Sequence, residues 1–154
     1  MTENTTPEQN AARGYTITRV FDAPRELVWK ALTEPEQFAQ WFGLVGSRLE
    51  AVSMDVRPGG RWSATMIIPG APEMAWEGHY EEVAEPERLV MTLLDRQVQD
   101  RVYELMTFTL TNIGDKTELV LRQSGGHLTD EQYGQANEGT AAFLDRMAEL
   151  LARA

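Results

Sequence analysis

Hydrophobic and polar positions first alternate in a short run of β-branched and aromatic residues. The sequence "YTITRVF", from Tyr15 to Phe21, has a period near two, which predicts a half-buried strand. The following "DAPRELVWKAL" predicts a helix with Asp22 as its N-cap and apolar residues on one face. A second short helix is predicted from "TEPEQFAQWF", where Thr33 is the cap and Pro35 lies in the first turn.

From Arg48 to Ser124 the period stays near two. Six strands are predicted, in "RLEAVSMDV", "GRWSATMII", "MAWEGHYEEV", "RLVMTLL", "RVYELMTFTLT" and "TELVLRQ". The short separators are rich in Gly, Pro, Asn or Asp, so an antiparallel meander is expected. In "DVRPGGRW" the glycines lead into a strand and not into a helix N-terminus. Gly59 and Gly60 are therefore interpreted as a tight reversal with positive φ values and not as a phosphate cradle.

The last segment changes to a helical period. Thr129 and Gln132 predict a capping box, and apolar residues recur after it at spacings of three and four. The pattern predicts one amphipathic helix of about 24 residues, about 36 Å long. Gly134 and Gly139 lie inside it and cost roughly 1 kcal/mol each relative to alanine, which indicates that something near them needs space.

This order of elements predicts an α+β fold. One strand, two short helices, six further strands and a long helix predict a curved antiparallel sheet of about six to seven strands wrapped around the C-terminal helix. A bent sheet that wraps a long helix often leaves a cavity, and such concavities are default ligand sites. The 154 residues fit a single domain over residues 15–154, preceded by a flexible polar tail over residues 1–14.

Composition and charge narrow the classes of partner. The formal net charge is -10, which repels nucleic acids and anionic lipid surfaces, so neither a nucleic acid nor a membrane is expected. There is no cysteine, which excludes disulfides, thiolate metal sites and thiol nucleophiles. The apolar runs are far shorter than a membrane span, and "MTENTTPEQNAARG" lacks the features of a secretory signal. A soluble cytoplasmic protein is predicted.

Several motifs, in the same order, resemble one known family. They are "TRVFDAPRELVWKALTEPEQFAQWF", "DVRPGGRW", "EGHYEEVAEPERLVMT", "TFTLTNIGDKTELVL" and the helix ending "FLDRMAELL". Together they resemble the activator-of-heat-shock-protein-90-ATPase-homologue-like family of the START/Bet v 1-like (SRPBCC) superfamily, from about Tyr15 to Leu151. The resemblance implies the helix-grip fold and a hydrophobic cavity for lipids, polyketides or other apolar small molecules. The heat-shock partner role belongs to eukaryotic members with an additional N-terminal domain, whereas this chain resembles only their C-terminal module.

Two positions depart from the pattern of that family. The family often has two adjacent tryptophans after the second short helix, where this sequence has Trp41 followed by Phe42. The glycine in the long helix is commonly followed by tryptophan, and here Gly139 is followed by Thr140. The second departure predicts a cavity that is wider or more polar at this point than in relatives.

Catalytic and metal-binding motifs are missing from the sequence. It has no phosphate loop, no dinucleotide fingerprint, no zinc-protease motif and no nucleophile elbow, so neither a metal nor a tightly bound cofactor is expected. The two histidines are His79 and His127. His79 is predicted to face outward by its parity with Glu77 and Glu81. His127 is interpreted as a loop residue, because the pattern gives it no metal or nucleophilic partner.

The aromatic and methionine-rich strand faces predict a ligand pocket beneath the terminal helix. Methionine adapts to irregular ligands, and tryptophan offers an amphipathic wall. Glu104 and Gln123 are polar residues among apolar neighbours, so they either orient a ligand or lie near strand ends in water. The predicted ligand-binding residues are Trp41, Trp62, Met66, Trp76, Tyr80, Glu104, Met106, Phe108, Gln123, Thr140 and Phe143.

The sequence leaves alternatives to this pocket open. An ordinary packed core explains the same apolar faces equally well. An enzyme of the polyketide cyclase or aromatase kind is a second alternative, in which an acid, a base or an oxyanion donor comes from Tyr80, Tyr103, Glu104 and Arg122. A module that contacts a partner protein, including a chaperone, is a third, and a homodimer stays open. Our hypothesis is a binding protein for an unidentified hydrophobic small molecule, with no catalytic residue assigned.

Overall fold

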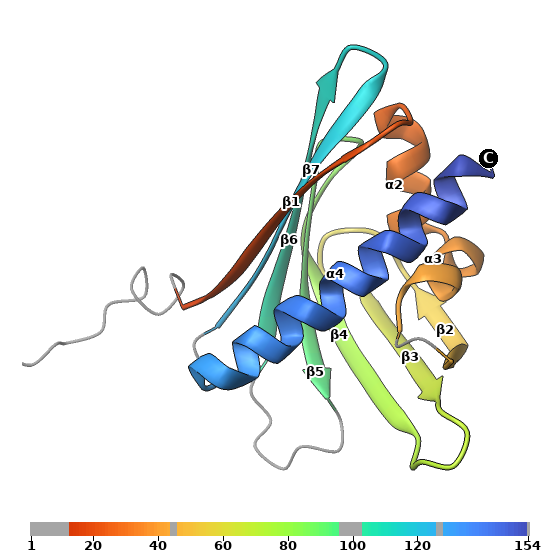
Figure 1. Cartoon of the computed structure of the whole chain (residues 1–154), viewed down its shortest axis with the longest axis vertical. Helices are drawn as coiled ribbons and strands as arrows, with labels where there is room; N and C mark the ends of the chain where they lie inside the picture. Colours follow the sequence, from red (N-terminus) through yellow and green to blue (C-terminus); the bar gives the residue numbers. More distant parts are fainter. Residues whose placement is uncertain (1–12, 44–45, 96–102, 126–127, 154) are drawn as a thin grey trace, which may run out of the picture.

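The fold is known from a computed structural model, which describes residues 13–43, 46–95, 103–125 and 128–153. Its elements, shown in Figure 1, are β1 (Gly14–Phe21), α2 (Arg25–Thr33), α3 (Pro35–Trp41), β2 (Arg48–Met54), β3 (Arg61–Ile67), β4 (Met74–Ala84), β5 (Arg88–Asp95), β6 (Glu104–Ile113), β7 (Lys116–Ser124) and α4 (Asp130–Ala152). Residues 1–12 of the predicted tail and most of the turn predicted after β5 lie outside the described residues.

The strands form one antiparallel sheet of seven strands in the order β1-β7-β6-β5-β4-β3-β2. Strands β2 to β7 pair in chain order, as expected for a meander, whereas β1 pairs with the last strand. The chain reaches β2, at the opposite edge of the sheet, through α2 and α3. The predicted α+β helix-grip fold is therefore confirmed.

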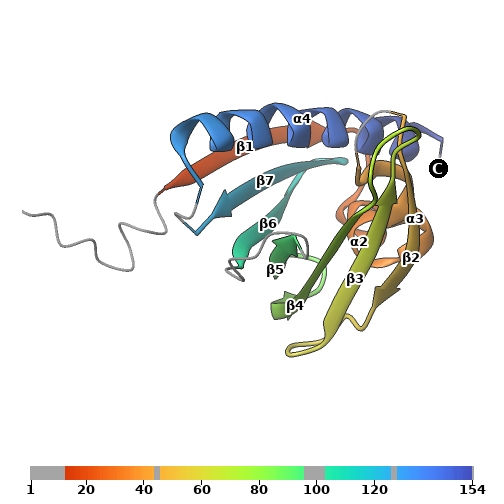
Figure 2. The same cartoon turned by 90° about the horizontal axis from the view of Figure 1, so that it is seen from below.

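Helix α4 lies on the concave face of the sheet (Figures 1 and 2). Its main contacts with other elements are to β1, α3 and α2, and its C-terminal half lies beside α2 and α3. The predicted capping box is present, because the Thr129 hydroxyl accepts from the backbone N–H of Gln132 and the Gln132 amide oxygen accepts from the N–H of Thr129. The cap fixes where the helix starts and hence which residues face the sheet.

The caps of the two short helices differ from the sequence prediction. Pro24, not Asp22, is the N-cap of α2, because Pro24 has the extended conformation of a cap residue and the helix begins directly after it. Glu34, not Thr33, is the N-cap of α3. The Thr33 hydroxyl instead donates to the carbonyl of Trp29. Thr33 is thus the last residue of α2, and Pro35 is the first residue of α3, a position that proline favours.

The loop before β3 confirms a tight reversal but with different roles for its two glycines. Gly59 has φ +83°, the left-handed region that favours glycine. Gly60 does not have a positive φ, so that part of the prediction is wrong. A Cβ on Gly60 would lie 1.9 Å from the carbonyl oxygen of Asp55, which makes glycine necessary there for close packing. The loop also pairs with β4 through Gly59 N–H to Tyr80 O and Tyr80 N–H to Gly60 O.

An aromatic cluster fills the space between α3 and the sheet. Phe38 stacks on Phe42 at 4.6 Å and meets Trp41 edge-on at 5.1 Å. Trp62 of β3 packs edge-on against both phenylalanines. This packing occupies the concave face on the side of α2 and α3. The first half of α4 lies above the remaining part of that face (Figure 2).

Candidate functional site

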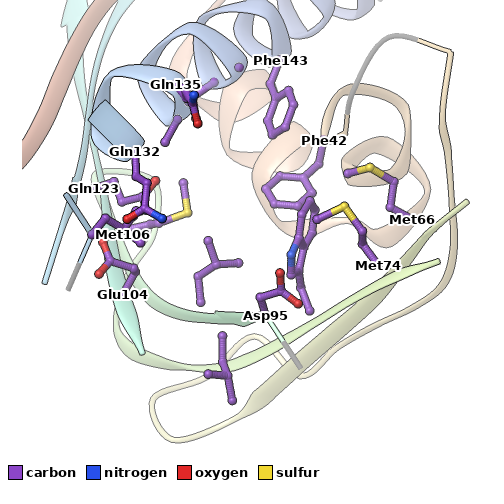
Figure 3. Close-up of a pocket in the computed structure, with 17 residues that line it drawn as sticks. Phe42, Met66, Met74, Asp95, Glu104, Met106, Gln123, Gln132, Gln135 and Phe143 are labelled. Atoms are coloured by element: carbon purple, nitrogen blue, oxygen red, sulfur yellow. Dashed lines mark hydrogen bonds between the residues drawn. The ribbon is translucent and has the colours of Figure 1, made fainter. Parts of the chain in front are cut away.

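A cavity of about 630 Å³ lies between the first half of α4 and the concave face of the sheet (Figure 3). Five strands and the helix contribute to its walls. The lining residues are Phe42, Met66, Met74, Trp76, Leu93, Leu94, Asp95, Glu104, Met106, Gln123, Leu128, Gln132, Gln135, Ala136, Gly139, Thr140 and Phe143. Protein cores contain few voids larger than a water molecule, so a space of this size is not a packing defect.

The sequence of α4 explains why space remains beneath it. The helix presents Ala136, Gly139 and Thr140 to the cavity, and all three side chains are small. A Cβ built on Gly139 meets nothing within 4 Å apart from its chain neighbours and the backbone of its own helix. The space predicted near this glycine is therefore the cavity itself. Gly134 also has nothing within 4 Å of a built Cβ, but it does not line the cavity.

One side of the cavity is formed mainly by aromatic and methionine side chains, with Asp95 at its edge. The ring of Phe42 lies 5.0 Å from that of Trp76 and 5.2 Å from that of Phe143, so the three rings form a continuous wall. Figure 3 shows Met66 and Met74 on the same side. Aromatic rings and flexible thioethers together suit a large apolar ligand of irregular shape.

The opposite side carries a buried carboxylate. Glu104, the first residue of β6, is only 7% exposed. Its Oε1 accepts a hydrogen bond from Gln123 Nε2 at 3.2 Å. The Tyr133 hydroxyl of α4 donates to both carboxylate oxygens, at 3.0 Å to Oε1 and 3.2 Å to Oε2. These bonds satisfy part of the hydrogen-bonding capacity of a group that is costly to bury alone.

The hydrogen-bond network continues from Gln123 to β1 and back to α4. The Tyr15 hydroxyl donates to Gln123 Oε1 at 2.8 Å and lies 2.7 Å from Thr140 Oγ1. A tyrosine has a single hydroxyl proton, so the Thr140 hydroxyl is the donor to Tyr15. Burial raises the pKa of Tyr15 to about 12. The network joins β1, β6, β7 and α4 at one end of the cavity.

Comparison with known proteins places this architecture in a family. Residues 22–152 match the family described as Activator of Hsp90 ATPase homolog 1-like protein. The chain belongs to this family. The resemblance to this family seen in the sequence is thus confirmed. A search of the curated proteins finds no match.

Solved structures with the same fold include proteins from several bacteria. Protein CV1439 from Chromobacterium violaceum is similar with a TM-score of 0.80 and 24% identity, over 89% of this chain and 95% of that one. CalU16 from Micromonospora echinospora is similar with a TM-score of 0.66 and 21% identity, over 88% of this chain and 74% of that one. DynU16, a protein of the dynemicin biosynthetic locus, is similar with a TM-score of 0.70 and 23% identity, over 89% of this chain and 46% of the DynU16 chain. At these identities the likeness shows the fold alone.

In this member of the Activator of Hsp90 ATPase homolog 1-like family, the cavity collects seven of the eleven residues predicted to bind a ligand. They are Met66, Trp76, Glu104, Met106, Gln123, Thr140 and Phe143. Glu104 and Gln123 are buried and hydrogen-bonded to one another, so neither lies in open water. The polar character predicted at Thr140 is present, since its hydroxyl belongs to the network.

The structure places the other four residues in the packed core, away from the cavity lining. The Trp41 Nε1–H donates to the carbonyl of Ala31 at 2.7 Å, and that of Trp62 donates to the carbonyl of Thr92 at 2.8 Å. Both indoles are therefore satisfied by backbone oxygens. Tyr80 and Phe108 are at most 1% exposed, and burial raises the pKa of Tyr80. Their strand faces are correct, but the aromatic cluster and the helices α2 and α3 fill that part of the interior.

Ten lining residues were not among the predicted ligand-binding residues. They are Phe42, Met74, Leu93, Leu94, Asp95, Leu128, Gln132, Gln135, Ala136 and Gly139. The helical ones carried a usable signal, because Gln132, Gln135, Ala136 and Gly139 precede Thr140 and Phe143 at steps of three and four. Leu93 lies opposite Glu104 and so follows the inward parity of β5, whereas Leu94 carried no signal, since adjacent residues of a strand normally face opposite sides.

The residues considered for catalysis do not gather at the cavity. Of Tyr80, Tyr103, Glu104 and Arg122, only Glu104 lines it. The His79 ring lies 2.6 Å from the Glu81 carboxylate and outside the lining, as predicted, while His127 lies outside the described residues. Within the described ranges, no group of three or more His, Cys, Asp or Glu is arranged to hold a metal ion. The same part of the chain contains no helix with the length and hydropathy of a membrane span.

Proposed function

We propose that this protein binds a hydrophobic small molecule in the cavity beneath α4. The observation that carries the proposal is a space of about 630 Å³ with a three-ring wall at one side and a buried carboxylate at the other. Ligand pockets generally measure about 300–1,000 Å³ and combine mostly apolar walls with a few fixed polar groups. An ordinary core would have closed around a space of this size.

The wall of the cavity has rigid and adaptable residues, which have different roles in binding a ligand. Phe42, Trp76 and Phe143 are held by ring-to-ring contacts, so they offer a preformed surface for an aromatic or alicyclic body. Met66 and Met74 have flexible side chains that adjust to the outline of the ligand. Burial of the ligand's apolar surface supplies the affinity, at about 25 cal/mol per Å² removed from water.

A cavity-filling variant tests the proposal. Gly139→Leu adds a large side chain at a position that lines the cavity and where a built Cβ meets nothing within 4 Å outside its own helix backbone, so we expect the fold to be retained while the ligand loses its room. Gly134→Leu is the matched control, because its Cβ also meets nothing within 4 Å but it does not line the cavity. The probe is 2-naphthylmethanol, a neutral molecule, titrated by calorimetry.

The expected result is measurable binding to the unaltered protein, at least tenfold weaker binding to Gly139→Leu, and less than a twofold change for Gly134→Leu. Equal affinity in both variants would place the probe outside the cavity and contradict the proposal. The absence of binding by 2-naphthylmethanol and by a panel of neutral apolar compounds would also contradict it.

A further inference from the structure

The hydrogen bonds at the polar end of the cavity all run in one direction. The Gln123 amide is oriented by its neighbours, since its nitrogen faces the Glu104 carboxylate and its oxygen accepts from Tyr15. Thr140 therefore donates a hydrogen bond to Tyr15, Tyr15 donates to Gln123, and Gln123 donates to Glu104. The Tyr133 hydroxyl also donates to Glu104. Each of the three hydroxyl protons is used within the protein, and the network ends on an acceptor.

Glu104 keeps acceptor capacity for a ligand. A carboxylate offers about four lone-pair sites on its two oxygens. Among the described residues, Gln123 and Tyr133 donate to Oε1, while Oε2 receives only the longer branch of the bond from Tyr133, at 3.2 Å. Glu104 also lines the cavity, so a polar group of the ligand would meet an oxygen that accepts and does not donate.

Charge favours the same kind of ligand. The described residues that line the cavity include two carboxylates, Asp95 and Glu104, and no lysine, arginine or histidine. The whole chain has a formal net charge of -10. An anionic ligand would therefore bring a further negative charge into a partly buried space that has no cation among its described lining residues, which is strongly unfavourable. A cationic ligand would be attracted by the Glu104 carboxylate.

We propose that the ligand is an apolar molecule with a protonated amine as its polar group, bound with that amine at Glu104 and its hydrocarbon body against the aromatic wall. This inference rests on the proposed binding function and narrows its ligand class. An ammonium group provides several donors and no acceptor, which matches an oxygen with unused lone pairs. Charge-assisted hydrogen bonds are about twice as strong as neutral ones, so the amine should bind with higher affinity than an alcohol of the same shape.

Three matched compounds test the inference on the full chain at pH 7. They are 2-naphthylmethylamine, 2-naphthylmethanol and 2-naphthoic acid, which present a cation, a neutral hydroxyl and an anion on the same ring system. Calorimetry should rank their affinities amine, alcohol, acid, with the amine at least fivefold tighter than the alcohol and at least thirtyfold tighter than the acid. An acid that binds as tightly as the amine, or an alcohol equal to it, would overturn the inference.

The variant Glu104→Gln assigns the preference to one residue. It removes the charge while the amide oxygen can still accept from Tyr133. The ratio of amine to alcohol affinity should fall at least fivefold in this variant. Glu138→Gln, on the exposed side of α4, makes the same change of charge outside the cavity lining and should leave the ratio within twofold. An unchanged ratio in Glu104→Gln would overturn the inference.

The two proposals fail in different ways. If none of the three compounds binds, the binding function itself is contradicted. If the compounds bind and Gly139→Leu blocks them, but the amine shows no preference, only the assignment of an amine fails. Thermal unfolding followed by circular dichroism checks the fold of each variant. Should Glu104→Gln not fold, the ranking of the three compounds on the unaltered protein still decides the inference.

Discussion

Two buried tyrosines give the protein a sensitivity to high pH. The pKa of Tyr15 is raised to about 12, mainly by burial, and the nearby Glu104 and Tyr133 add to the rise while the hydrogen bond with Thr140 opposes it. The pKa of Tyr80 is also raised, mainly by burial and further by Asp55. In both cases the folded protein holds the phenol proton more tightly than the unfolded chain does, where the pKa is about 10.

The free energy of unfolding should therefore fall between about pH 10 and pH 12. A raised tyrosine pKa leaves stability unaffected well below pH 10, and stability is lost as the unfolded chain alone begins to ionise. The shift of Tyr15 from 10.0 to about 12 corresponds to a loss of about 2–3 kcal/mol once both states are ionised. Urea unfolding at pH 9, 10 and 11 measures this slope.

The control for that measurement is Tyr15→Phe. It removes one of the two tyrosines, so the slope of stability against pH above pH 10 should become smaller. A slope identical to that of the unaltered protein would show that Tyr15 is not responsible. Absorbance at 295 nm, which detects tyrosinate, should show both buried groups ionising together with unfolding.

Some residue roles could be predicted from the sequence and others could not. Glu104 and Gln123 stood out, because a polar side chain on an apolar strand face needs a partner. The partners themselves were not predictable. Tyr15 lies 108 residues from Gln123, and Tyr133 lies 29 residues from Glu104, so only the folded chain brings them into contact.

The periodicity of the strands predicts only part of the environment of each residue. Alternation places a residue on the inner or outer face of the sheet but does not say what covers that point. Trp62 and Met66 lie on the same face of β3, and yet Trp62 packs against Phe38 and Phe42 while Met66 lines the cavity. The difference depends on where α2 and α3 end along the sheet, which is set by tertiary packing.

Helix α4 should be stabilised by alanine at either of its glycines. Gly134→Ala and Gly139→Ala each remove the conformational cost of glycine in a helix, and neither new methyl group meets an atom within 4 Å outside its chain neighbours and its own helix backbone. We expect each substitution to raise the free energy of unfolding by about 0.5–1 kcal/mol, measured by chemical denaturation. Destabilisation by either change would contradict the open space described around these positions.

At the scale of the whole molecule, the packing is uneven along α4. The C-terminal half buries Leu144, Met147 and Leu151, and Arg146 Nη1 donates to the carbonyl of Gly43 at 2.6 Å. The N-terminal half lies above the cavity and is held by Tyr133, Thr140 and contacts with β1. A helix segment with an open space beneath it has fewer buried apolar contacts to lose when it opens.

Amide hydrogen exchange should therefore differ between the halves of this helix. Backbone amides over residues 134–141 should exchange at least tenfold faster than those over residues 144–151 in the free protein, measured by mass spectrometry or NMR. Addition of 2-naphthylmethanol at saturation should slow the first group selectively. Uniform protection along α4, or slowing confined to its C-terminal half, would contradict this view of the cavity.

The architecture as a whole was more predictable than the cavity. Turn chemistry, the capping box at Thr129 and the order of the motifs all indicated the same fold, so an error in one element, such as the cap assigned to Asp22, did not alter it. The size of the cavity depends on the sum of many side-chain volumes and on the separation of α4 from the sheet. No local pattern encodes that sum, which explains why the sequence could not distinguish a cavity from a filled core.

The distribution of the four tryptophans gives the protein an optical signal of its own. Trp29, Trp41 and Trp62 are at most 5% exposed and do not line the cavity, whereas Trp76 does. Occupancy of the cavity therefore changes the surroundings of one indole directly, and the other three provide a nearly constant background of emission. A change in the fluorescence spectrum on binding can be assigned to a single position without attaching a dye.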